Sequence, residues 1–283
     1  MSFAWHRDMK KVLIYTAVVL LILIGVGTLV VNRAIVHIRL PHGAVLHVLP
    51  ARENNQTRGA VILCPGGGYN HLARWNEGYL WFPFFYRQGF AVAMLEYRMP
   101  NQDPQTPVID GTEAIRLMRN RAEEWHYDAG NVGMMGFSAG GHLASTLMVS
   151  KKAAVRPDFG ILFYPVVSMK KELTHQRSHD CLLGQDASEQ LETRYSSELH
   201  VSEQTPPAYL AVSRDDPKVK PENAIRFHDA MQAKNRPVSL HVYPSGGHGW
   251  GCLPTFDHYS RMLDDLAGWL NDRQHESLNE RKP

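Results

Sequence analysis

The sequence has little of what marks a nucleic-acid-binding protein, a zinc site or a disulfide-stapled domain. Basic and acidic residues nearly balance, leaving a net charge of +2, and no basic cluster stands out. A nucleic-acid partner would require an excess of positive charge on one face, so none is expected. The three cysteines, Cys64, Cys181 and Cys252, lie far apart without the spacing of metal ligands. Their odd number excludes a fully paired disulfide framework within one chain.

Charge is also absent from residues 12–31, which form a long apolar run. At about 20 residues, this run is long enough to cross a bilayer as a helix. Arg7, Lys10 and Lys11 precede it, and the positive-inside rule then keeps the short N-terminus in the cytoplasm. A cleaved signal peptide is the alternative, although no small-x-small cleavage site follows the run. We therefore expect residues 1–33 to form a cytoplasmic stub and a single-pass signal-anchor, with the rest of the chain periplasmic or otherwise extracytoplasmic.

From residue 34 onward, short apolar runs alternate with longer segments of helical periodicity. The expected strands cover 35–40, 44–49, 60–63, 90–95, 132–137, 158–164, 208–213 and 238–243. The expected helices cover 108–126, 143–149, 222–235 and 256–270, before a loose polar tail. This alternation is typical of an α/β fold with a mainly parallel sheet covered on both faces. It lapses over 165–204, which we expect to be a cap or insertion within one domain at 34–283.

Residues 136–141 read Gly-Phe-Ser-Ala-Gly-Gly and fit G-x-S-x-G, in which a serine occupies a sharp turn between a strand and a helix. The flanking segments have the patterns of that strand and that helix. Side chains at Gly136 and Gly140 would collide with backbone in so tight a turn, and glycine adopts unusual dihedral angles cheaply. The pattern predicts that Ser138 is a nucleophile. A glycine-rich turn with an incidental serine is the alternative.

A serine needs a base to act as a nucleophile at neutral pH, and that base needs an orienting group. On the α/β-hydrolase topology, an acid and then a histidine follow the serine, on loops after later strands. Asp215 and Asp216 follow the strand expected at 208–213, and His248 follows the strand expected at 238–243. The sequence therefore provides a base and an acid in the required order, with the choice between the two aspartates open.

A glycine cluster, Gly66 to Gly68, follows the strand expected at 60–63. Glycines leave backbone N–H groups free to point at a ligand oxygen. A flexible loop is the alternative interpretation. A phosphate-binding P-loop would need a Gly-Lys-Ser/Thr continuation, which is missing.

Taken together, these motifs resemble the α/β-hydrolase esterases that deacetylate xylan and other sugar esters, near the hormone-sensitive-lipase and dienelactone-hydrolase branches. The resemblance covers about residues 60–269. The motifs are PGGGY at 65–69, LEYR at 95–98, GFSAGGHLA at 136–144, ELHV at 198–201, TPPAYL at 205–210, DDPKVKPEN at 215–223 and YPSGGHGWG at 243–251. They imply an α/β-hydrolase fold and a serine esterase without a cofactor or metal. They are not specific to one substrate.

The resemblance implies Ser138 as nucleophile, His248 as general base and then acid, and one aspartate as the group that orients the histidine. The family's D-x-x-V-P run places the acid three residues before its valine. Val219 occupies that place and selects Asp216, although Lys220 stands where the family usually has proline. The neighbouring aspartate is then a solvated turn residue.

The resemblance also implies an oxyanion hole formed by the backbone N–H groups of Gly67, Gly68 and Ala139. Candidate substrate contacts are Tyr69, His71 and Trp250. His142, near the start of the helix that follows the serine turn, is expected to be a packed or capping residue. His175 and His179 have the four-residue spacing of helical metal ligands, but this spacing is common by chance and no metal is predicted.

We therefore expect a membrane-tethered serine esterase that acts on carbohydrate or other small-molecule esters through an acyl-enzyme, and no nucleic-acid partner. A serine peptidase of the prolyl-oligopeptidase type, a metal-dependent deacetylase and a non-catalytic module on a hydrolase fold are the alternatives. The intact set of Ser138, Asp216 and His248 argues against the non-catalytic module. The acyl group, the alcohol and the oligomeric state are left open by the sequence.

Overall fold

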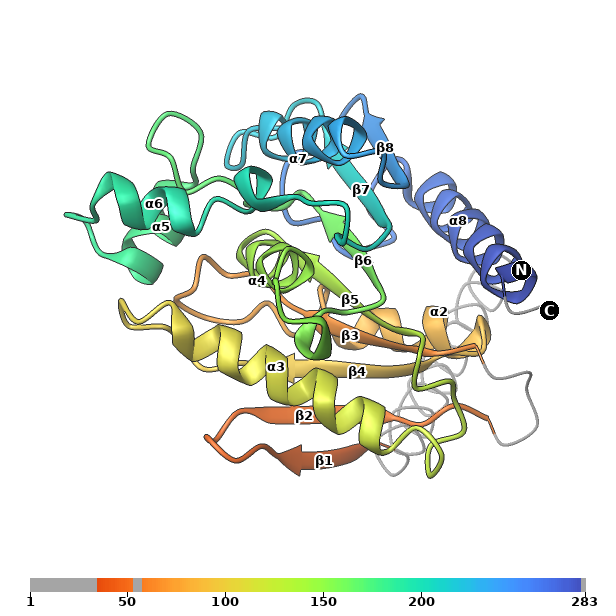
Figure 1. Cartoon of the computed structure of the whole chain (residues 1–283). Coiled ribbons are helices and arrows are strands. Elements are labelled where there is room, and N and C mark those ends of the chain that lie inside the picture. Colours follow the sequence, from red (N-terminus) through yellow and green to blue (C-terminus); the bar gives the residue numbers. More distant parts are fainter. Residues whose placement is uncertain (1–34, 53–57, 281–283) are drawn as a thin grey trace, which may run out of the picture. The chain divides into compact units, whose positions relative to one another are not determined.

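An eight-stranded sheet forms the centre of the computed structural model, which describes residues 35–52 and 58–280 (Figure 1). Its strands are β1 (Val36–Arg39), β2 (Val45–Leu49), β3 (Ala60–Cys64), β4 (Ala91–Glu96), β5 (Val132–Phe137), β6 (Phe159–Phe163), β7 (Ala208–Ser213) and β8 (Val238–Tyr243). Their spatial order is β1-β2-β4-β3-β5-β6-β7-β8. Strand β2 pairs antiparallel with β4, and every pairing from β4 to β8 is parallel. The predicted mainly parallel sheet is confirmed.

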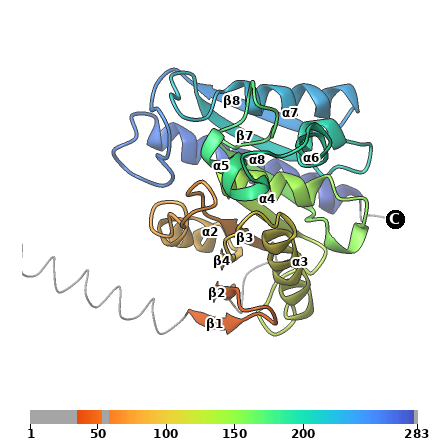
Figure 2. The ribbon, with the colours of Figure 1, turned by 90° about the vertical axis from the view of Figure 1, so that its left-hand side faces the viewer.

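Helices cover both faces of the sheet. They are α2 (Phe82–Arg87), α3 (Gln105–Asn120), α4 (Ala139–Met148), α5 (Gln176–Leu183), α6 (Glu189–Arg194), α7 (Glu222–Ala233) and α8 (Tyr259–Glu280), with 3-10 turns η1 (Tyr79–Trp81), η2 (Ala153–Val155) and η3 (Ser197–His200). Figure 2 shows α2 and α3 on opposite sides of the sheet. On β6, the ring of Phe159 packs against Trp269 of α8, whereas a Cβ on Gly160 would stand 2.1 Å from Sδ of Met148 in α4. Neighbouring strand residues thus face different helices.

The central strands are continuous apolar runs because both of their faces are covered. Every residue of β3, β5, β6 and β7 is buried. The register then aligns the loops that follow them: Cys64 pairs with Gly136, and Ser213 pairs with Tyr243. The glycine cluster therefore begins beside the serine turn, and the aspartate loop begins beside the histidine loop.

Some elements differ from the sequence-based expectations. The tail expected to be loose continues α8 through Glu280, because residues 271–280 contain no glycine or proline to end a helix. The segment 165–204 contains α5, α6 and η3, whose short lengths give no clear helical period. Helix α2 was missed because its run of buried aromatic residues lacks a polar face. That 165–204 acts as a cap, and that the catalytic domain starts at residue 34, stay predictions.

The transmembrane helix expected over residues 12–31 lies outside the described residues. Among residues 35–52 and 58–280, no helix is both long and apolar enough to span a bilayer. Helix α8 has 22 residues, a sufficient length, but it carries charged residues such as Asp264, Asp265 and Arg273. The predicted fold class is therefore corrected: the structure supports an α/β-hydrolase domain with a mostly parallel sheet and, among these residues, no membrane-spanning helix.

Candidate active site

Ser138 occupies the turn between β5 and α4, with φ of 50° and ψ of −119°. A positive φ is strained for a residue with a side chain, so the surrounding structure must hold it. The Ser138 N–H donates to the Phe163 carbonyl at 3.1 Å, and the Ser138 carbonyl accepts from the N–H groups of His142 and Val166 at 3.2 and 3.0 Å. These bonds tie the turn to β6 and α4 and fix the serine at the carboxyl edge of the sheet.

The glycines beside this serine are needed because the backbone approaches them closely. A Cβ on Gly136 would stand 2.3 Å from the carbonyl oxygen of Gly140, and a Cβ on Gly140 would stand 1.9 Å from the carbonyl oxygen of Cys64. Neither glycine has a positive φ. The collision expected from the sequence is therefore present, whereas the unusual dihedral angles belong to Ser138 itself.

The structure brings Ser138, His248 and Asp216 together across three loops. His248 Nε2 lies 2.9 Å from Ser138 Oγ, and His248 Nδ1 lies 2.6 Å from Asp216 Oδ2. An ionised carboxylate can only accept, so Nδ1 carries the proton and Nε2 is left to accept the serine proton. This is the arrangement of a nucleophile, a base and an orienting acid.

The two adjacent aspartates have different partners. Besides His248, Asp216 accepts hydrogen bonds from the N–H groups of Lys218 and Val219 at 2.8 and 3.0 Å through Oδ1. Its side chain is 1% exposed, so these bonds hold a buried carboxylate in one orientation. The geometry matches the aspartate that the D-x-x-V pattern selects, even with Lys220 in place of proline.

Asp215 binds the backbone of the histidine loop and is not the hydrogen-bond partner of the His248 ring. Its carboxylate accepts hydrogen bonds from the N–H groups of Gly246 and Gly247, at 3.3 and 2.9 Å. These bonds, the one from Gly247 first, lower the pKa of Asp215 because they favour its charged form. The expected solvated turn residue is thus exposed but also ties its own loop to the next one.

The residues expected to form the oxyanion hole lie on the glycine loop and at the start of α4. Gly67 and Gly68 both have positive φ, 127° and 63°, and a Cβ on Gly67 would stand 2.1 Å from the carbonyl oxygen of His71. Both glycines line the same cavity as Ser138. Ala139 is the first residue of α4, so its N–H has no acceptor within the helix. Their positions suit an oxyanion hole.

A cavity of about 500 Å³ opens in front of Ser138 and His248. The glycine loop, the serine turn and the histidine loop contribute to its wall, and His71 lies on it as the sequence suggested. The segment after β6 adds His175 and Arg177, which sequence analysis had not placed near the serine. Helix α5, which begins directly after His175 and contains Arg177, gave no periodic signal that could have indicated its position.

Glu77 was not among the predicted site residues, yet it lies on the cavity wall and is only 3% exposed. Its Oε2 accepts the Gly66 N–H at 2.7 Å, and its Oε1 accepts the hydroxyl of Tyr164 at 2.9 Å. Burial raises the pKa of Glu77, and the two hydrogen bonds oppose that effect. The Tyr164 ring packs against the ring of His248, with centroids 4.8 Å apart. No motif in the sequence marks this glutamate.

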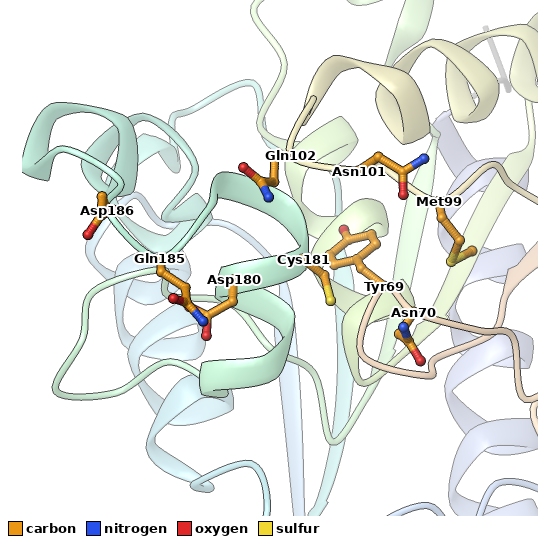
Figure 3. A pocket seen from close by; sticks show the side chains of 9 residues that line it. All are labelled: Tyr69, Asn70, Met99, Asn101, Gln102, Asp180, Cys181, Gln185 and Asp186. Atoms are coloured by element: carbon orange, nitrogen blue, oxygen red, sulfur yellow. The ribbon is translucent and has the colours of Figure 1, made fainter.

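Two of the candidate substrate contacts are buried in the structure. Trp250 stacks on Phe256 with ring centroids 4.2 Å apart, and its indole N–H donates to Ser213 Oγ at 3.0 Å. Tyr69 lines a second cavity, of about 460 Å³, which does not include Ser138 or His248 among its lining residues (Figure 3). The Tyr69 hydroxyl donates to His142 Nδ1 at 2.9 Å. Both rings thus have evident packing partners.

His142 is packed, in agreement with the sequence-based interpretation. It is 2% exposed, and its Nε2 donates to the carbonyl of Tyr195 at 2.7 Å. Burial lowers the pKa of His142 to about 4, so the ring is neutral near pH 7. Its two hydrogen bonds join α4 to Tyr69 and to the segment after β6.

The two histidines weighed as metal ligands have separate partners. His179 is buried between Asp180 Oδ1 at 3.0 Å and Glu192 Oε1 at 3.3 Å. His175 Nδ1 lies 2.9 Å from Ser178 Oγ. Across the described ranges, no group of three or more His, Cys, Asp and Glu side chains is arranged to hold a metal ion.

Comparison with known proteins identifies similar chains. The family model BD-FAE matches residues 46–231. The acetylxylan esterase of Xylanibacter ruminicola is 38% identical over 220 residues, which is 76% of this chain and 46% of that protein. Endo-1,4-beta-xylanase B of Butyrivibrio fibrisolvens is 31% identical over 207 residues, which is 68% of this chain and 32% of that protein. The chain thus spans less than half the length of these curated relatives.

A solved structure supports the same relationship. The acetyl ester-xyloside bifunctional hydrolase from Caldicellulosiruptor lactoaceticus aligns with a TM-score of 0.74 at 31% identity, covering 81% of this chain and 88% of that chain. The resemblance to α/β-hydrolase esterases inferred from the motifs is confirmed. From the family match over 46–231 and the 38% identity, the chain belongs to the BD-FAE family.

Proposed function

We propose that the protein is a serine carboxylic-ester hydrolase that removes acetyl or other short acyl groups from carbohydrate. The observation that carries this proposal is the hydrogen-bonded series from Ser138 through His248 to Asp216, at 2.9 and 2.6 Å, on the wall of an open cavity. The choice of acetylated carbohydrate is supported by the relatives, one an acetylxylan esterase and another an acetyl ester-xyloside hydrolase.

In the first half of the reaction, Ser138 Oγ attacks the ester carbonyl carbon while His248 Nε2 takes the hydroxyl proton. The N–H groups of Ala139, Gly67 and Gly68 stabilise the oxyanion that forms. The bond between carbon and the alcohol oxygen then breaks, and His248 returns its proton to that oxygen. The sugar leaves, and the acyl group stays on Ser138.

In the second half, a water molecule attacks the acyl-enzyme as His248 Nε2 accepts its proton. The bond between the carbonyl carbon and Ser138 Oγ breaks, and His248 gives the proton back to Oγ. Acetate is released and the enzyme is restored. Asp216 remains ionised throughout, orienting Nδ1 and stabilising the imidazolium that forms twice in the cycle.

Hydrolysis of 4-nitrophenyl acetate tests the reaction type. Ser138→Ala and His248→Ala are each expected to lower kcat by about a thousand-fold or more, and the double variant should be little worse because the groups act as a unit. Covalent labelling by a fluorophosphonate should occur in the parent protein and be absent from Ser138→Ala. Equal hydrolysis rates for parent protein and Ser138→Ala would contradict the proposal.

Acetate release from acetylated xylan tests the substrate class. A blocked dipeptide anilide is the matched control for the peptidase alternative. We expect acetate release from the polysaccharide with no cleavage of the anilide. Anilide cleavage that exceeds ester hydrolysis would favour the peptidase.

A further inference from the structure

The cavity in front of Ser138 carries two positively charged side chains that the proposed reaction does not use. Arg177, the second residue of α5, and Lys218, in the loop after β7, both line it. Both side chains are exposed. Among the hydrogen bonds and ion pairs of the described residues, none involves the Arg177 guanidinium or the Lys218 ammonium group. Two cationic residues without a described side-chain partner therefore line the cavity that contains Ser138.

Arg177 lies beside the glycine loop. A Cβ on Gly68 would stand 3.2 Å from Cδ and 3.4 Å from Cγ of Arg177, and 3.7 Å from Cε1 of His175. The aliphatic stem of the arginine and the histidine ring thus cover the loop that would hold the oxyanion. Arg177 lines the same cavity as Ser138, and its exposed side chain ends in the guanidinium that follows this packed stem.

Lys218 lines the cavity from the loop after β7. Its backbone N–H binds Asp216 Oδ1 at 2.8 Å, so the residue is anchored next to the carboxylate that holds His248. The pKa of His175 is lowered by burial first and then by the charges of His248, Arg177 and Lys218, while the charge of Asp216 acts in the opposite direction. The cationic groups are therefore close enough to influence one another.

The acidic groups of this cavity cannot neutralise that charge by pairing. The lining includes one carboxyl group, Glu77, which is buried and already bound to the Gly66 N–H and the Tyr164 hydroxyl. Asp216, behind the histidine, is bound to His248 and to backbone N–H groups. No exposed Asp or Glu side chain is among the residues that line this cavity.

The second cavity has the opposite character, which shows that the positive charge is local. It is lined by Asp180 and Asp186 together with side-chain amides, and by no lysine or arginine (Figure 3). Helix α5 contributes to both cavities: Arg177 to the one that contains Ser138, and Asp180 with Cys181 to the other. One helix therefore separates a cationic space from an acidic and amide-lined one.

We propose that Arg177 and Lys218 bind a carboxylate carried by the ester substrate, so that the enzyme prefers acylated acidic sugars of the uronic acid class over their neutral counterparts. A guanidinium binds a carboxylate through paired, charge-assisted hydrogen bonds, and an ammonium group adds a further donor. This inference rests on the proposed esterase function and specifies its substrate.

The test compares two acetyl esters of matched size: an acetylated methyl glucuronoside and its uronamide, in which a neutral amide replaces the carboxylate and adds no second ester bond. Acetate release gives kcat/KM for each. We expect the parent protein to prefer the acid by about 10- to 100-fold, the range for hydrogen bonds between charged groups. The preference should shrink as ionic strength rises, because the cations are solvent-exposed.

The variants are Arg177→Met and Lys218→Met, in which an unbranched side chain keeps much of the aliphatic stem and loses the charge. Each should lower the ratio of acid to neutral ester, and the double variant should bring it near one. Arg177→Lys should restore part of the ratio. Lys171→Met is the control, since Lys171 is exposed on the same segment but does not line the cavity, and its ratio should equal that of the parent.

Two outcomes would overturn the inference: a ratio near one in the parent protein, or a preference that survives in the double variant. A sulfated acetyl glycoside preferred over the carboxylate would overturn the assignment to a carboxylate, and with it the assignment to the uronic acid class. Hydrolysis of the neutral ester that depends on Ser138, without any preference for charge, would remove this inference and leave the esterase function intact. Absence of all ester hydrolysis would instead remove the function itself.

Discussion

Glu77 accepts a hydrogen bond from the hydroxyl of Tyr164 at 2.9 Å. Through this bond, one buried carboxyl group connects the glycine loop with the histidine loop. Its other oxygen holds the Gly66 N–H at 2.7 Å, at the start of the glycine loop. The Tyr164 ring lies against His248, and its hydroxyl oxygen also accepts the Gly251 N–H at 2.8 Å. The oxyanion loop and the histidine loop are therefore braced by the same pair of side chains.

Substitution of this pair should affect turnover more than substrate binding. Tyr164→Phe keeps the ring against His248 but removes the hydroxyl, and Glu77→Gln replaces one acceptor oxygen by a donor. We expect either change to lower kcat by about tenfold, on the scale of one or two lost buried hydrogen bonds, with KM changed less than twofold.

Steady-state kinetics with 4-nitrophenyl acetate, together with thermal unfolding, separates positioning from mere stability. Tyr86→Phe serves as a control, since Tyr86 is a partly exposed tyrosine of α2 that does not line the cavity. If both site variants lose stability yet turn over at the parent rate, the pair has no positioning role.

Substitution of the two neighbouring aspartates should affect kcat very differently. Asp216→Asn replaces the acceptor of the His248 Nδ1 proton, favouring the wrong tautomer, and should lower kcat by about 10⁴-fold. Asp215→Asn leaves the ring's partner in place and weakens the bonds to Gly246 and Gly247. Asp215→Asn should therefore lower kcat by less than about tenfold. The measurement is kcat for each variant, and a larger loss from Asp215→Asn than from Asp216→Asn would contradict the assignment.

The hydrogen-bonded grouping of Ser138, His248 and Asp216 could be predicted because its signals are local. The residues around Ser138 form one contiguous motif, and β5, β7 and β8 were predicted with the observed limits because each is a short apolar run. Parallel register then places the loops carrying Asp216 and His248 side by side, as strand order requires. The chain order of such a site is thus enough to find its principal groups.

The supporting groups could not be predicted because their contacts are distant in sequence. Glu77 and Tyr164 are 87 positions apart, and neither belongs to a motif. Arg177 reaches the glycine loop from a helix of eight residues, too short for a hydrophobic period to reveal which side it presents. Such contacts follow from how the segment after β6 packs on the sheet, which the pattern of a single sequence does not encode.

The buried ring of His142 should make stability depend on pH. Its pKa is lowered by burial to about 4 in the folded protein, against 6.5 for a free histidine, so the unfolded chain binds the proton more tightly. The stabilising contribution is therefore complete above pH 6.5 and is lost as the pH falls toward 4. This group alone should lower the free energy of unfolding by about 2 kcal/mol between pH 7 and pH 5.

His142→Gln isolates this effect, because an amide can donate to the Tyr195 carbonyl and accept from the Tyr69 hydroxyl without titrating. Urea unfolding at pH 7 and pH 5 gives the two free energies for each protein. The loss on acidification should be smaller in the variant by about 2 kcal/mol. An identical loss in both proteins would show that His142 is not held neutral.

The close approach of Gly140 to Cys64 should exclude any side chain at position 140 of the serine turn. A Cβ on Gly140 would stand 1.9 Å from the Cys64 carbonyl oxygen, and that oxygen belongs to the backbone of β3, which cannot move without breaking the sheet. Gly140→Ala should therefore destabilise the protein by more than about 3 kcal/mol and displace Ser138.

Gly268→Ala provides the contrast, because Gly268 lies within α8 with nothing inside 4 Å of the added Cβ. Alanine in an open helical position should raise stability by about 0.5–1 kcal/mol. Thermal unfolding and fluorophosphonate labelling report on both variants: we expect a lower Tm with slower labelling for Gly140→Ala, and a slightly higher Tm with unchanged labelling for Gly268→Ala. A Gly140→Ala protein with the parent's Tm and labelling rate would mean that β3 and the serine turn can separate freely, and the strained turn would then not depend on this contact.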